Sequence, residues 1–269
     1  MDFSIVNNRG LVLLGCGKMG SALLEGWLAQ GVSAGAVSVI DPAPSAWLQA
    51  QGVAINDPLP EAPAIVLIAV KPQMMGDALP SLRRFGADTA YVSIAAGTSI
   101  ASFEQAIGAD AAIIRSMPNT PAAVGRGITA IVGNTKATAA QMDLAEALLG
   151  AVGQVVRLDD EDQIDAVTGV SGSGPAYVFH LIETLAAAGE AEGLSADLAM
   201  QLATATVAGA GHLAMEADES PSQLRINVTS PNGTTQAALE VLMDDAKGFP
   251  PLLKRAVKAA TERGRELKG

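Results

Sequence analysis

The residues from Val228 to Thr235, Val-Thr-Ser-Pro-Asn-Gly-Thr-Thr, have the types and spacing of a site for a small anion. Proline, asparagine and glycine predict a tight turn, and the apolar periodicity from Gln236 onward predicts a helix that begins there. The first backbone N–H groups of a helix lack intrahelical partners and carry partial positive charge. This stretch could therefore hold a small carboxylate. The same residue types also cap ordinary helices, and that alternative stays open from this stretch alone.

A second stretch, Gly15-Cys16-Gly17-Lys18-Met19-Gly20, has the Gly-x-Gly-x-x-Gly spacing of a dinucleotide site. It follows an apolar run directly and leads into a helical pattern. In such a turn Gly15 permits the sharp bend, Gly17 lets a pyrophosphate approach the backbone, and Gly20 lets helix and strand pack closely. The alternative is a strand-to-helix turn with incidental glycines. The context of strand and helix favours the dinucleotide interpretation.

Asp41 stands 21 residues after Gly20, at the end of the next predicted strand. A carboxylate there can accept hydrogen bonds from the adenosine ribose hydroxyls. It would repel a 2′-phosphate, and Lys71 is the only cation between Asp41 and Arg83. The sequence therefore favours NADH over NADPH. The alternative is that Asp41 only begins the turn at Asp41-Pro42.

Three further segments are expected to follow parallel strands, at the edge where open α/β sheets bind ligands. They are Ala69-Val70-Lys71-Pro72, Ile94-Ala95-Ala96-Gly97 and Met117-Pro118-Asn119-Thr120-Pro121. Each one alone could be ordinary loop chemistry. Three small or proline-rich strand ends that converge on one edge indicate a shared cofactor site.

A parallel sheet is needed to position these segments. Short aliphatic runs alternate with amphipathic stretches between Leu11 and about Asp159, which is typical of an α/β domain. The predicted strands are Leu11–Leu14, Val37–Asp41, Ala64–Val70, Tyr91–Ala95, Ala112–Arg115, Ile128–Val132 and Val155–Leu158. Ser21–Gln30 is predicted to be a helix that buries Leu23, Leu24 and Trp27.

The chain changes character after Asp165. Gly169–Pro175 interrupts regular structure, and almost everything beyond it has helical periodicity. We predict a Rossmann-type dinucleotide-binding domain at residues 1–164 and an all-helical domain at residues 165–269. The first helix of the second domain is predicted to start at Pro175 and to run to about Glu192. Its predicted buried stripe is Val178, Leu181, Ile182, Leu185 and Ala188. The small residues of Ala203–Ala214 predict a helix packed among others, and Pro251–Leu267 is predicted to be a helix with one charged face in water.

Composition excludes several classes of protein. The net charge of −11 disfavours nucleic acid as a partner. The start of the chain lacks the pattern of a signal peptide, and the purest aliphatic run is too short to span a membrane. The single cysteine, Cys16, can form no internal disulfide and has no cysteine partner for zinc, so we expect a cytoplasmic protein with no bound metal. His180 and His212, the only histidines, are expected to pack within helices.

Five stretches, taken in order, resemble those of pyrroline-5-carboxylate reductase. They are Gly15–Gly20, Ala69–Gln73, Arg115–Pro121, Gly172–Tyr177 and Thr229–Thr235. The resemblance covers nearly the whole chain from Leu11 to the last helix. The glycine motif occurs in many dehydrogenases, whereas the last two stretches at this separation are specific to the family. The resemblance therefore favours the carboxylate-binding interpretation of Thr229–Thr235 over a plain helix cap.

The resemblance implies a Rossmann-type domain followed by an all-α dimerisation domain. It implies reduction of Δ1-pyrroline-5-carboxylate to L-proline, the last step of proline biosynthesis, with NADH or NADPH. It also implies homodimers that assemble into a larger homo-oligomer such as a decamer. Two departures stand out: Asn232 replaces a frequent glycine, which asparagine tolerates in a left-handed conformation, and Asp41 stands where many relatives have residues suited to NADPH.

The resemblance also assigns roles to residues. The backbone around Ser230, Gly233 and Thr234 holds the substrate carboxylate, and the Thr235 hydroxyl faces the imine nitrogen as the catalytic group. Hydride transfer to a protonated imine needs little acid–base machinery, so positioning should dominate. Met117 and Asn119 approach the nicotinamide. The full set of cofactor-binding candidates is Gly15, Gly17, Lys18, Met19, Gly20, Asp41, Asn56, Ala69, Val70, Lys71, Pro72, Ala95, Ala96, Gly97, Met117 and Asn119.

Two other functions compete with this interpretation. One is a different two-domain oxidoreductase, such as a β-hydroxyacid dehydrogenase or a general imine reductase. Those dehydrogenases usually rely on a lysine or another acid–base residue in the helical domain, and no lysine or arginine lies between Pro175 and Leu224. The other is a non-catalytic sensor of nicotinamide cofactors. A sensor has no need of the Thr229–Thr235 loop.

Overall fold

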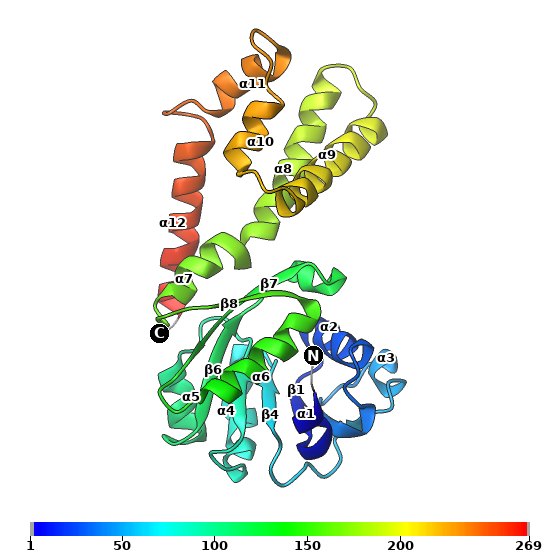
Figure 1. Cartoon of the computed structure of the whole chain (residues 1–269), viewed down its shortest axis with the longest axis vertical. Helices are drawn as coiled ribbons and strands as arrows, with labels where there is room; N and C mark the ends of the chain where they lie inside the picture. The colour runs from blue at the N-terminus through cyan, green and yellow to red at the C-terminus, as the bar shows by residue number, and fades with distance from the viewer. Residues whose placement is uncertain (1–2, 268–269) are drawn as a thin grey trace. The chain divides into compact units, whose positions relative to one another are not determined.

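The structure is a computed structural model that describes residues 3–267. The chain forms two compact units (Figure 1). The first comprises the chain up to Gly172 together with the residues from Ala260 onward, and the second comprises Ser173–Ala259. The first unit therefore continues past residue 164, because Ile164 and Asp165 are buried within it.

A single eight-stranded sheet organises the first unit, with the order β3-β2-β1-β4-β5-β6-β7-β8. All neighbours are parallel except β6 and β7. The strands are β1 (Leu11–Leu14), β2 (Val37–Ile40), β3 (Ala54–Ile55), β4 (Ile65–Ile68), β5 (Ala90–Ser93), β6 (Ala112–Met117), β7 (Gly127–Gly133) and β8 (Gly153–Arg157). All seven predicted strands are present. The edge strand β3 was not predicted, because two residues are too short to show a periodic pattern.

Helices cover both faces of the sheet (Figure 1). They are α1 (Ser4–Arg9), α2 (Lys18–Ala29), α3 (Ala46–Gln49), α4 (Met75–Ala78), α5 (Ile100–Ile107), α6 (Ala139–Leu149) and α7 (Gln163–Val167). Tight 3₁₀ turns lie at Ala34–Ala36, Pro72–Met74, Leu79–Arg84, Thr120–Val124 and Gly150–Val152, and a π-helical turn lies at Thr168–Gly172. The predicted α/β class is confirmed by this arrangement.

The two faces of the sheet carry separate cores. On one face α2 and α6 pack against the strands, and Leu23, Leu24 and Trp27 are fully buried as predicted. The Trp27 indole donates a hydrogen bond of 2.8 Å to the backbone carbonyl of Leu148, which joins α2 to α6. On the other face α4, α5 and α7 pack against the strands. Because β1 and β4 are covered on both sides, their sequences are continuous aliphatic runs.

The second unit is helical. Its helices are α8 (Gly174–Ala191), α9 (Ala196–Glu216), α10 (Pro221–Asn227), α11 (Thr234–Leu242) and the first part of α12 (Phe249–Leu267). The charged residues of α12 from Lys254 to Arg265 are exposed, as predicted. None of the helices within residues 3–267 combines the length and the apolar character that a bilayer crossing requires.

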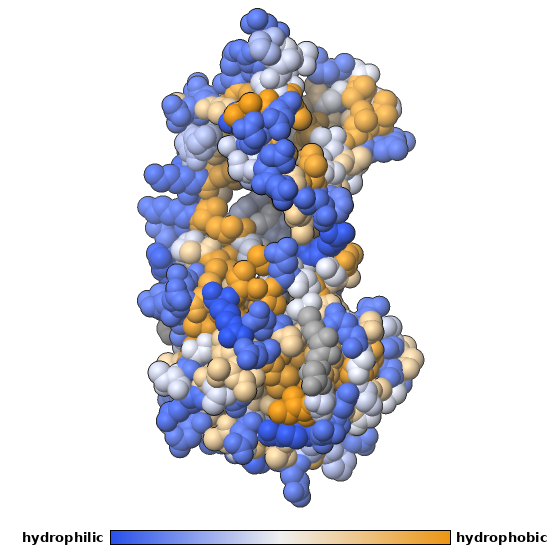
Figure 2. Space-filling model, in the orientation of Figure 1, coloured by the Kyte–Doolittle hydropathy of each residue, from blue (hydrophilic) through white to orange (hydrophobic). Residues whose placement is uncertain are grey.

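The helical unit has very little core of its own. Ala186, Ala199 and Ala203 are its buried cluster, with Ile182 packed against them. The predicted stripe of α8 is otherwise wrong for the single chain, because Val178, Leu181, Leu185 and Ala188 are exposed. Much of α9 is also exposed, so the prediction of a helix packed among others fails in the single chain. Apolar residues gather on the surface of this unit (Figure 2), which indicates a face that another chain covers.

Candidate functional site

The glycine-rich turn joins β1 to α2, and two of its glycines are required by the protein itself. Gly15 has φ +89°, and a Cβ there would lie 2.9 Å from Val70 Cγ1 and 3.0 Å from the Ala69 carbonyl oxygen. A Cβ at Gly20 would lie 2.6 Å from the Gly15 carbonyl oxygen. Only glycine fits at either position without a shift of backbone. These contacts also bring the turn against the end of β4.

Gly17 is different, because the protein does not require a glycine there. It is the N-cap of the 12-residue helix α2, with φ −75°, and a Cβ would meet no heavy atom within 4 Å. The space above this backbone is open, and the first N–H groups of α2 point out of the helix end. Gly17 and Lys18 are exposed, while Met19 is half-buried against the core. This turn fits a pyrophosphate that approaches the main chain closely.

Asp41 follows β2 and lies at the glycine-rich turn. Its Oδ2 accepts a 2.8 Å hydrogen bond from the Cys16 N–H, and its Oδ1 accepts one of 2.8 Å from the Ala43 N–H. The second bond is the Asx turn that the alternative interpretation of Asp41 expected. The carboxylate thus starts the turn and also stands beside the glycine-rich loop.

Asn56 holds the backbone of Asp41 from the next strand end. It has a left-handed φ of 54°, its Oδ1 accepts a 3.0 Å hydrogen bond from the Asp41 N–H, and its Nδ2 donates one of 2.7 Å to the Asp41 carbonyl oxygen. Its side-chain contacts are therefore to Asp41, and they fix the end of β2. This two-way pairing gives Asn56 a structural role beside its predicted cofactor contact.

The surroundings of Cys16 disfavour the thiolate form. Burial raises the pKa of its thiol to about 11, and the negative charge of Asp41 adds to the rise. The side chain is therefore a thiol at neutral pH, whereas nucleophilic attack requires the thiolate.

The other predicted cofactor residues follow β4, β5 and β6. Ala69 and Val70 are half-buried, Lys71 is exposed, and Pro72 begins a 3₁₀ turn, although its side chain lies outside the described part of the structure. Since β1, β4, β5 and β6 are parallel neighbours, their carboxyl ends meet at one edge of the sheet. The structure thus brings the cofactor candidates of these four strands to one edge.

The segments after β5 and β6 complete that edge. Ala95 is buried, Ala96 is exposed, and Gly97 has φ +78°. Met117 ends β6 and is buried, and the Asn119 Oδ1 accepts a 2.9 Å hydrogen bond from the Ile128 N–H. That bond orients the amide of Asn119 and leaves its nitrogen as the remaining donor.

A π-helical turn packs against Met117 and was not predicted from the sequence. A Cβ on Gly172, the last residue of this turn, would lie 3.5 Å from Met117 Sδ. Turns of this kind occur often at functional sites. The glycines and serines of Gly169–Gly174 signalled an interruption but not its geometry.

The predicted carboxylate site lies at the start of α11. Gly233 is the N-cap and has no side chain, so the first N–H groups of the helix are not capped by it. Asn232 has φ 59°, the left-handed conformation that asparagine tolerates. The Gly233 N–H bonds to the Ser230 carbonyl oxygen at 3.0 Å, which closes the turn. Thr234 is exposed and Thr235 is half-buried.

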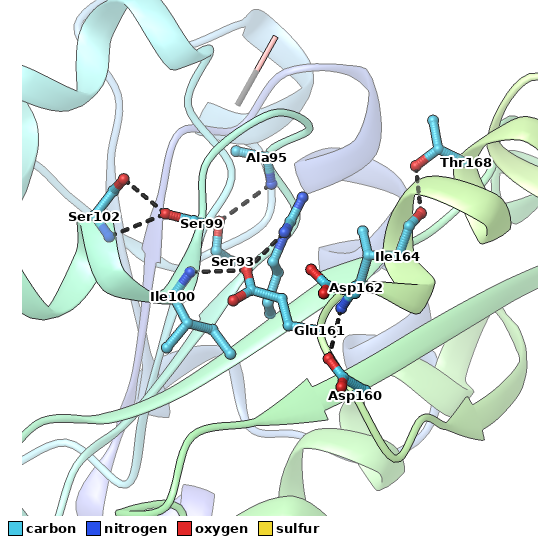
Figure 3. A network of polar contacts seen from close by, with 11 residues as sticks. Ser93, Ala95, Ser99, Ile100, Ser102, Asp160, Glu161, Asp162, Ile164 and Thr168 are labelled. Carbon is cyan, nitrogen blue, oxygen red and sulfur yellow. Dashed lines mark hydrogen bonds and ion pairs between the residues drawn. The ribbon is translucent and has the colours of Figure 1, made fainter. Parts of the chain in front are cut away.

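A polar network in the first unit was missed by the sequence interpretation (Figure 3). The Arg115 Nη1 lies 2.6 Å from Oε1 of Glu161, and the same oxygen accepts a 2.9 Å hydrogen bond from the Ile100 N–H. Arg115 is buried, and its Nε has no hydrogen-bond partner within the described chain. Only the arginine that directly follows the aliphatic residues Ala112–Ile114 could have signalled a buried partner.

The histidines do not have the predicted packing role in the single chain. His180 is exposed, with Nδ1 3.2 Å from the Glu183 carboxylate, and His212 is exposed as well. Within residues 3–267, no group of three or more His, Cys, Asp and Glu side chains could hold a metal ion.

The mostly parallel sheet and the open glycine-rich turn define a dinucleotide-binding protein with a helical second unit. Comparison with known families supports this class. Residues 10–97 match the family described as "NADP oxidoreductase coenzyme F420-dependent". Residues 161–267 match the family described as "Pyrroline-5-carboxylate reductase dimerisation".

Full-length relatives give the same result. The chain is 40% identical to the pyrroline-5-carboxylate reductase of Pseudomonas aeruginosa over 264 residues, which cover 96% of each chain. A pyrroline-5-carboxylate reductase of Coxiella burnetii has a solved structure with a TM-score of 0.89 and 32% identity, over 97% of this chain and 99% of that one. The Plasmodium falciparum enzyme, solved with NADP bound, has a TM-score of 0.82 and 27% identity, over 98% of this chain and 99% of that one.

The chain belongs to the pyrroline-5-carboxylate reductase family. Its activity is accordingly the NAD(P)H-dependent reduction of pyrroline-5-carboxylate in proline biosynthesis. The helical unit is the dimerisation domain of the family, so the chain forms a homodimer.

Proposed function

We propose that the chain reduces Δ1-pyrroline-5-carboxylate to L-proline with the cofactor held by the sheet edge of the first unit and the substrate carboxylate held at the start of α11. The observation that carries the proposal is the helix start at Gly233, where the turn leaves backbone N–H groups uncapped by a side chain. A helix start of this kind favours a negatively charged group. The substrate has one carboxylate, which is the group that such a site selects.

Substrate orientation is assigned to the turn and the first residues of α11. Charge-assisted hydrogen bonds from the backbone near Ser230, Gly233 and Thr234 contribute about 1.5–3 kcal/mol each. They fix the acid end of the five-membered ring. The Thr235 hydroxyl then bonds at the imine nitrogen. Holding the ring in one orientation contributes to the rate by lowering the entropic part of the barrier.

Cofactor binding is assigned to the edge residues. Gly17, Lys18 and Met19 hold the pyrophosphate, Asp41 and Asn56 lie on the adenosine side, and the segments after β4, β5 and β6 line the nicotinamide side. When bound, the reduced nicotinamide supplies the hydride. Met117 and Ala95, which are buried, exclude water from their part of this edge.

We further propose that NADH is preferred over NADPH. The Asp41 carboxylate is fixed by two backbone N–H groups beside the glycine-rich turn. A 2′-phosphate near that carboxylate would meet like charge. The Plasmodium falciparum relative was solved with NADP bound, so the preference proposed here differs from the cofactor in that structure.

One assay tests the reaction and the preference. Cofactor absorbance is followed with Δ1-pyrroline-5-carboxylate, once with NADH and once with NADPH. We expect turnover with a higher kcat/KM for NADH, and a shift toward NADPH in Asp41→Ser. A higher kcat/KM for NADPH in the wild type would overturn the preference alone. Absence of turnover with both cofactors would overturn the proposed function.

The assembly and location are proposed from the family resemblance and composition. We propose that the homodimers assemble into a larger ring such as a decamer, and that the protein works in the reducing cytoplasm, where a single cysteine needs no disulfide partner. Light scattering coupled to size exclusion measures the mass of the assembly. A mass of one dimer at working concentration would contradict the ring.

A further inference from the structure

We infer that Glu161 is a positioning residue for the cofactor, which it serves by fixing the loop between β5 and α5. This inference rests on the proposed function, which assigns Ala95–Gly97 of that loop to the cofactor. Glu161 itself is remote from the glycine-rich turn in sequence, because it follows β8 and precedes α7. It would act through the loop rather than on the reacting atoms.

The geometry centres on one carboxylate oxygen. Glu161 Oε1 accepts both from the Arg115 guanidinium at 2.6 Å and from the Ile100 N–H at 2.9 Å. The Arg115 side chain is 1% exposed and the Glu161 side chain 26% exposed. Hydrogen bonds to charged groups are about twice as strong as neutral ones, and partial burial strengthens them further. The Ile100 N–H is thereby tied to β6 through two side chains.

Ile100 is the first residue of α5, and its N–H is one of the groups that a helix start leaves unpaired. Ser99 caps the helix by accepting from the Ser102 N–H at 3.2 Å, but it does not reach Ile100. Glu161 satisfies that donor and places negative charge at the positive end of the helix. A turn in which the Asp162 N–H bonds to Asp160 Oδ1 at 2.8 Å presents the Glu161 side chain (Figure 3).

The loop between these anchors is short. At its start, Ser93 Oγ accepts from the Ala95 N–H at 3.2 Å, and the Ser93 carbonyl oxygen accepts from Ser116 Oγ at 2.8 Å. At its end, Ile100 is held by Glu161. Gly97 lies between the two anchors, and a Cβ there would be 3.3 Å from the Leu267 carbonyl oxygen. Loss of the Glu161 contact would release one end of the segment that carries Ala95–Gly97.

A purely structural role is the competing explanation. Arg115 is a buried cation, and any buried cation without its partner destabilises the fold. Stability alone therefore cannot separate the two roles. Cofactor binding to enzyme that is still folded can separate them, because a structural role changes the melting temperature and leaves the affinity of the folded protein unchanged.

The experiment uses the full-length dimeric enzyme and NADH. Four proteins are compared with the wild type: Glu161→Gln, the double variant Arg115→Met/Glu161→Leu, Gly17→Ala as a probe of the cofactor turn, and Asp110→Asn as a matched control. Asp110 forms an exposed ion pair of 3.3 Å with Lys136, so its variant also removes one carboxylate from an ion pair. The readouts are the Kd of NADH by fluorescence, the KM of both substrates and the melting temperature.

We expect Glu161→Gln to raise the Kd and KM of NADH by about 5- to 20-fold, with less than about a twofold change in the KM of pyrroline-5-carboxylate. Asp110→Asn should match the wild type. The double variant leaves no unpaired buried charge, so its melting temperature should recover toward the wild-type value while the Kd stays raised. If Glu161→Gln does not fold, the double variant provides the measurement of the Kd of NADH in its place.

Three results would overturn the inference. If Glu161→Gln leaves the Kd unchanged while Gly17→Ala raises it, the positioning role fails and the proposed cofactor site stands. If neither Glu161→Gln nor Gly17→Ala raises the Kd of NADH, the positioning role and the proposed cofactor site both fail. If the Kd of the double variant recovers together with its melting temperature, Glu161 and Arg115 have a structural role only.

Discussion

At the scale of single residues, Asp41 shows how one carboxylate serves several purposes. Its two oxygens take backbone hydrogen bonds from Cys16 and Ala43, so it joins the glycine-rich turn to the end of β2. Carboxylate oxygens have further acceptor capacity for ribose hydroxyls. The two interpretations of Asp41 that the sequence left open are therefore compatible, since the Asx turn fixes the side chain that the cofactor would meet.

Cys16, whose N–H bonds to the Asp41 carboxylate, has an unusual thiol. Burial raises the pKa of its thiol to about 11, with Asp41 as the second cause. We expect iodoacetamide to modify Cys16 roughly 10- to 100-fold more slowly than a free cysteine at pH 8, because little thiolate is present. Asp41→Asn should speed the modification. The chain has one cysteine, so mass spectrometry of the intact protein measures the rate without ambiguity.

The same shift gives a pH dependence of stability. The folded pKa lies above the unfolded value, so the thiol's contribution is fully present below about pH 8.5–9 and is lost as the pH rises through about 11. As the pH rises through that range, the free energy of unfolding should fall less in Cys16→Ala than in the wild type. An equal loss in both proteins, or wild-type alkylation at the rate of a free thiol, would contradict the shift.

Thr235 is the residue on which the proposed chemistry depends most. Thr235→Ala should lower kcat/KM for pyrroline-5-carboxylate by roughly 10- to 100-fold, because one hydrogen bond at the imine is lost. The Kd of NADH should not change. Thr235→Ser keeps the hydroxyl and should restore most of the activity. Steady-state kinetics near wild type in the alanine variant would remove Thr235 from the mechanism.

At the scale of elements, the β1–α2 turn separates glycines that the protein needs from a glycine that a ligand needs. Gly20→Ala places a Cβ 2.6 Å from the Gly15 carbonyl oxygen and should cost about 1–3 kcal/mol of unfolding free energy. Gly17→Ala meets only open space, so its stability should match the wild type. Its KM for NADH should nevertheless rise roughly tenfold, because the Cβ stands where the pyrophosphate approaches.

Chemical denaturation and cofactor titration of the two variants check this contrast. The variants are matched, since each adds one methyl group to the same turn. A loss of stability in Gly17→Ala with unchanged cofactor binding would show that its glycine is structural. Unchanged stability in Gly20→Ala would mean that the turn relaxes more easily than the close contact indicates.

The elements of the sheet were largely predictable, and the reason is physical. Strands buried on both faces, such as β1 and β4, appear as continuous aliphatic runs. The turn after β1 needs glycines at fixed positions, because backbone segments approach each other closely there. The pairing of Glu161 with Arg115 was not predictable. The two residues are 46 positions apart, and an ion pair leaves no periodic pattern in a sequence.

The candidate site also contains some residues that could be predicted from the sequence and others that could not. Residues fixed by short-range rules, such as Gly15, Gly20 and the left-handed Asn232, could be interpreted from their neighbours in sequence. The reciprocal bonds of Asn56 to Asp41 and the π-helical turn beside Met117 depend on how distant segments pack. Such packing is set by tertiary contacts that a local pattern does not contain.

At the scale of the whole molecule, the helical unit shows the limit of periodicity as a guide to burial. The apolar stripe of α8 predicted that one face of the helix leaves water. It could not tell whether the same chain or a second chain covers that face. The exposure of Val178, Leu181 and Leu185 in the single chain agrees with the dimerisation domain of the family.

The apolar face of α9 should be part of the dimer contact. Leu198 and Leu202 are 44% and 49% exposed and lie one turn apart on the same face. Leu198→Glu/Leu202→Glu should shift the protein from dimer toward monomer, because two charges per chain would be buried without partners. Ile5→Glu, which changes an apolar residue of α1 with 43% exposure, is the matched control. Sedimentation velocity measures the shift, and a dimer as stable as the wild type would exclude this face.

The division of the last helix between the two units has a consequence for how the protein is made. The first unit includes the chain from Ala260 onward, and Leu267 packs against Gly97. A ribosome therefore synthesises every strand of the sheet before it reaches the part of α12 that completes the same unit. Until that segment is made, the nascent sheet lacks one of its packing partners, and the Gly97 loop lacks its neighbour Leu267.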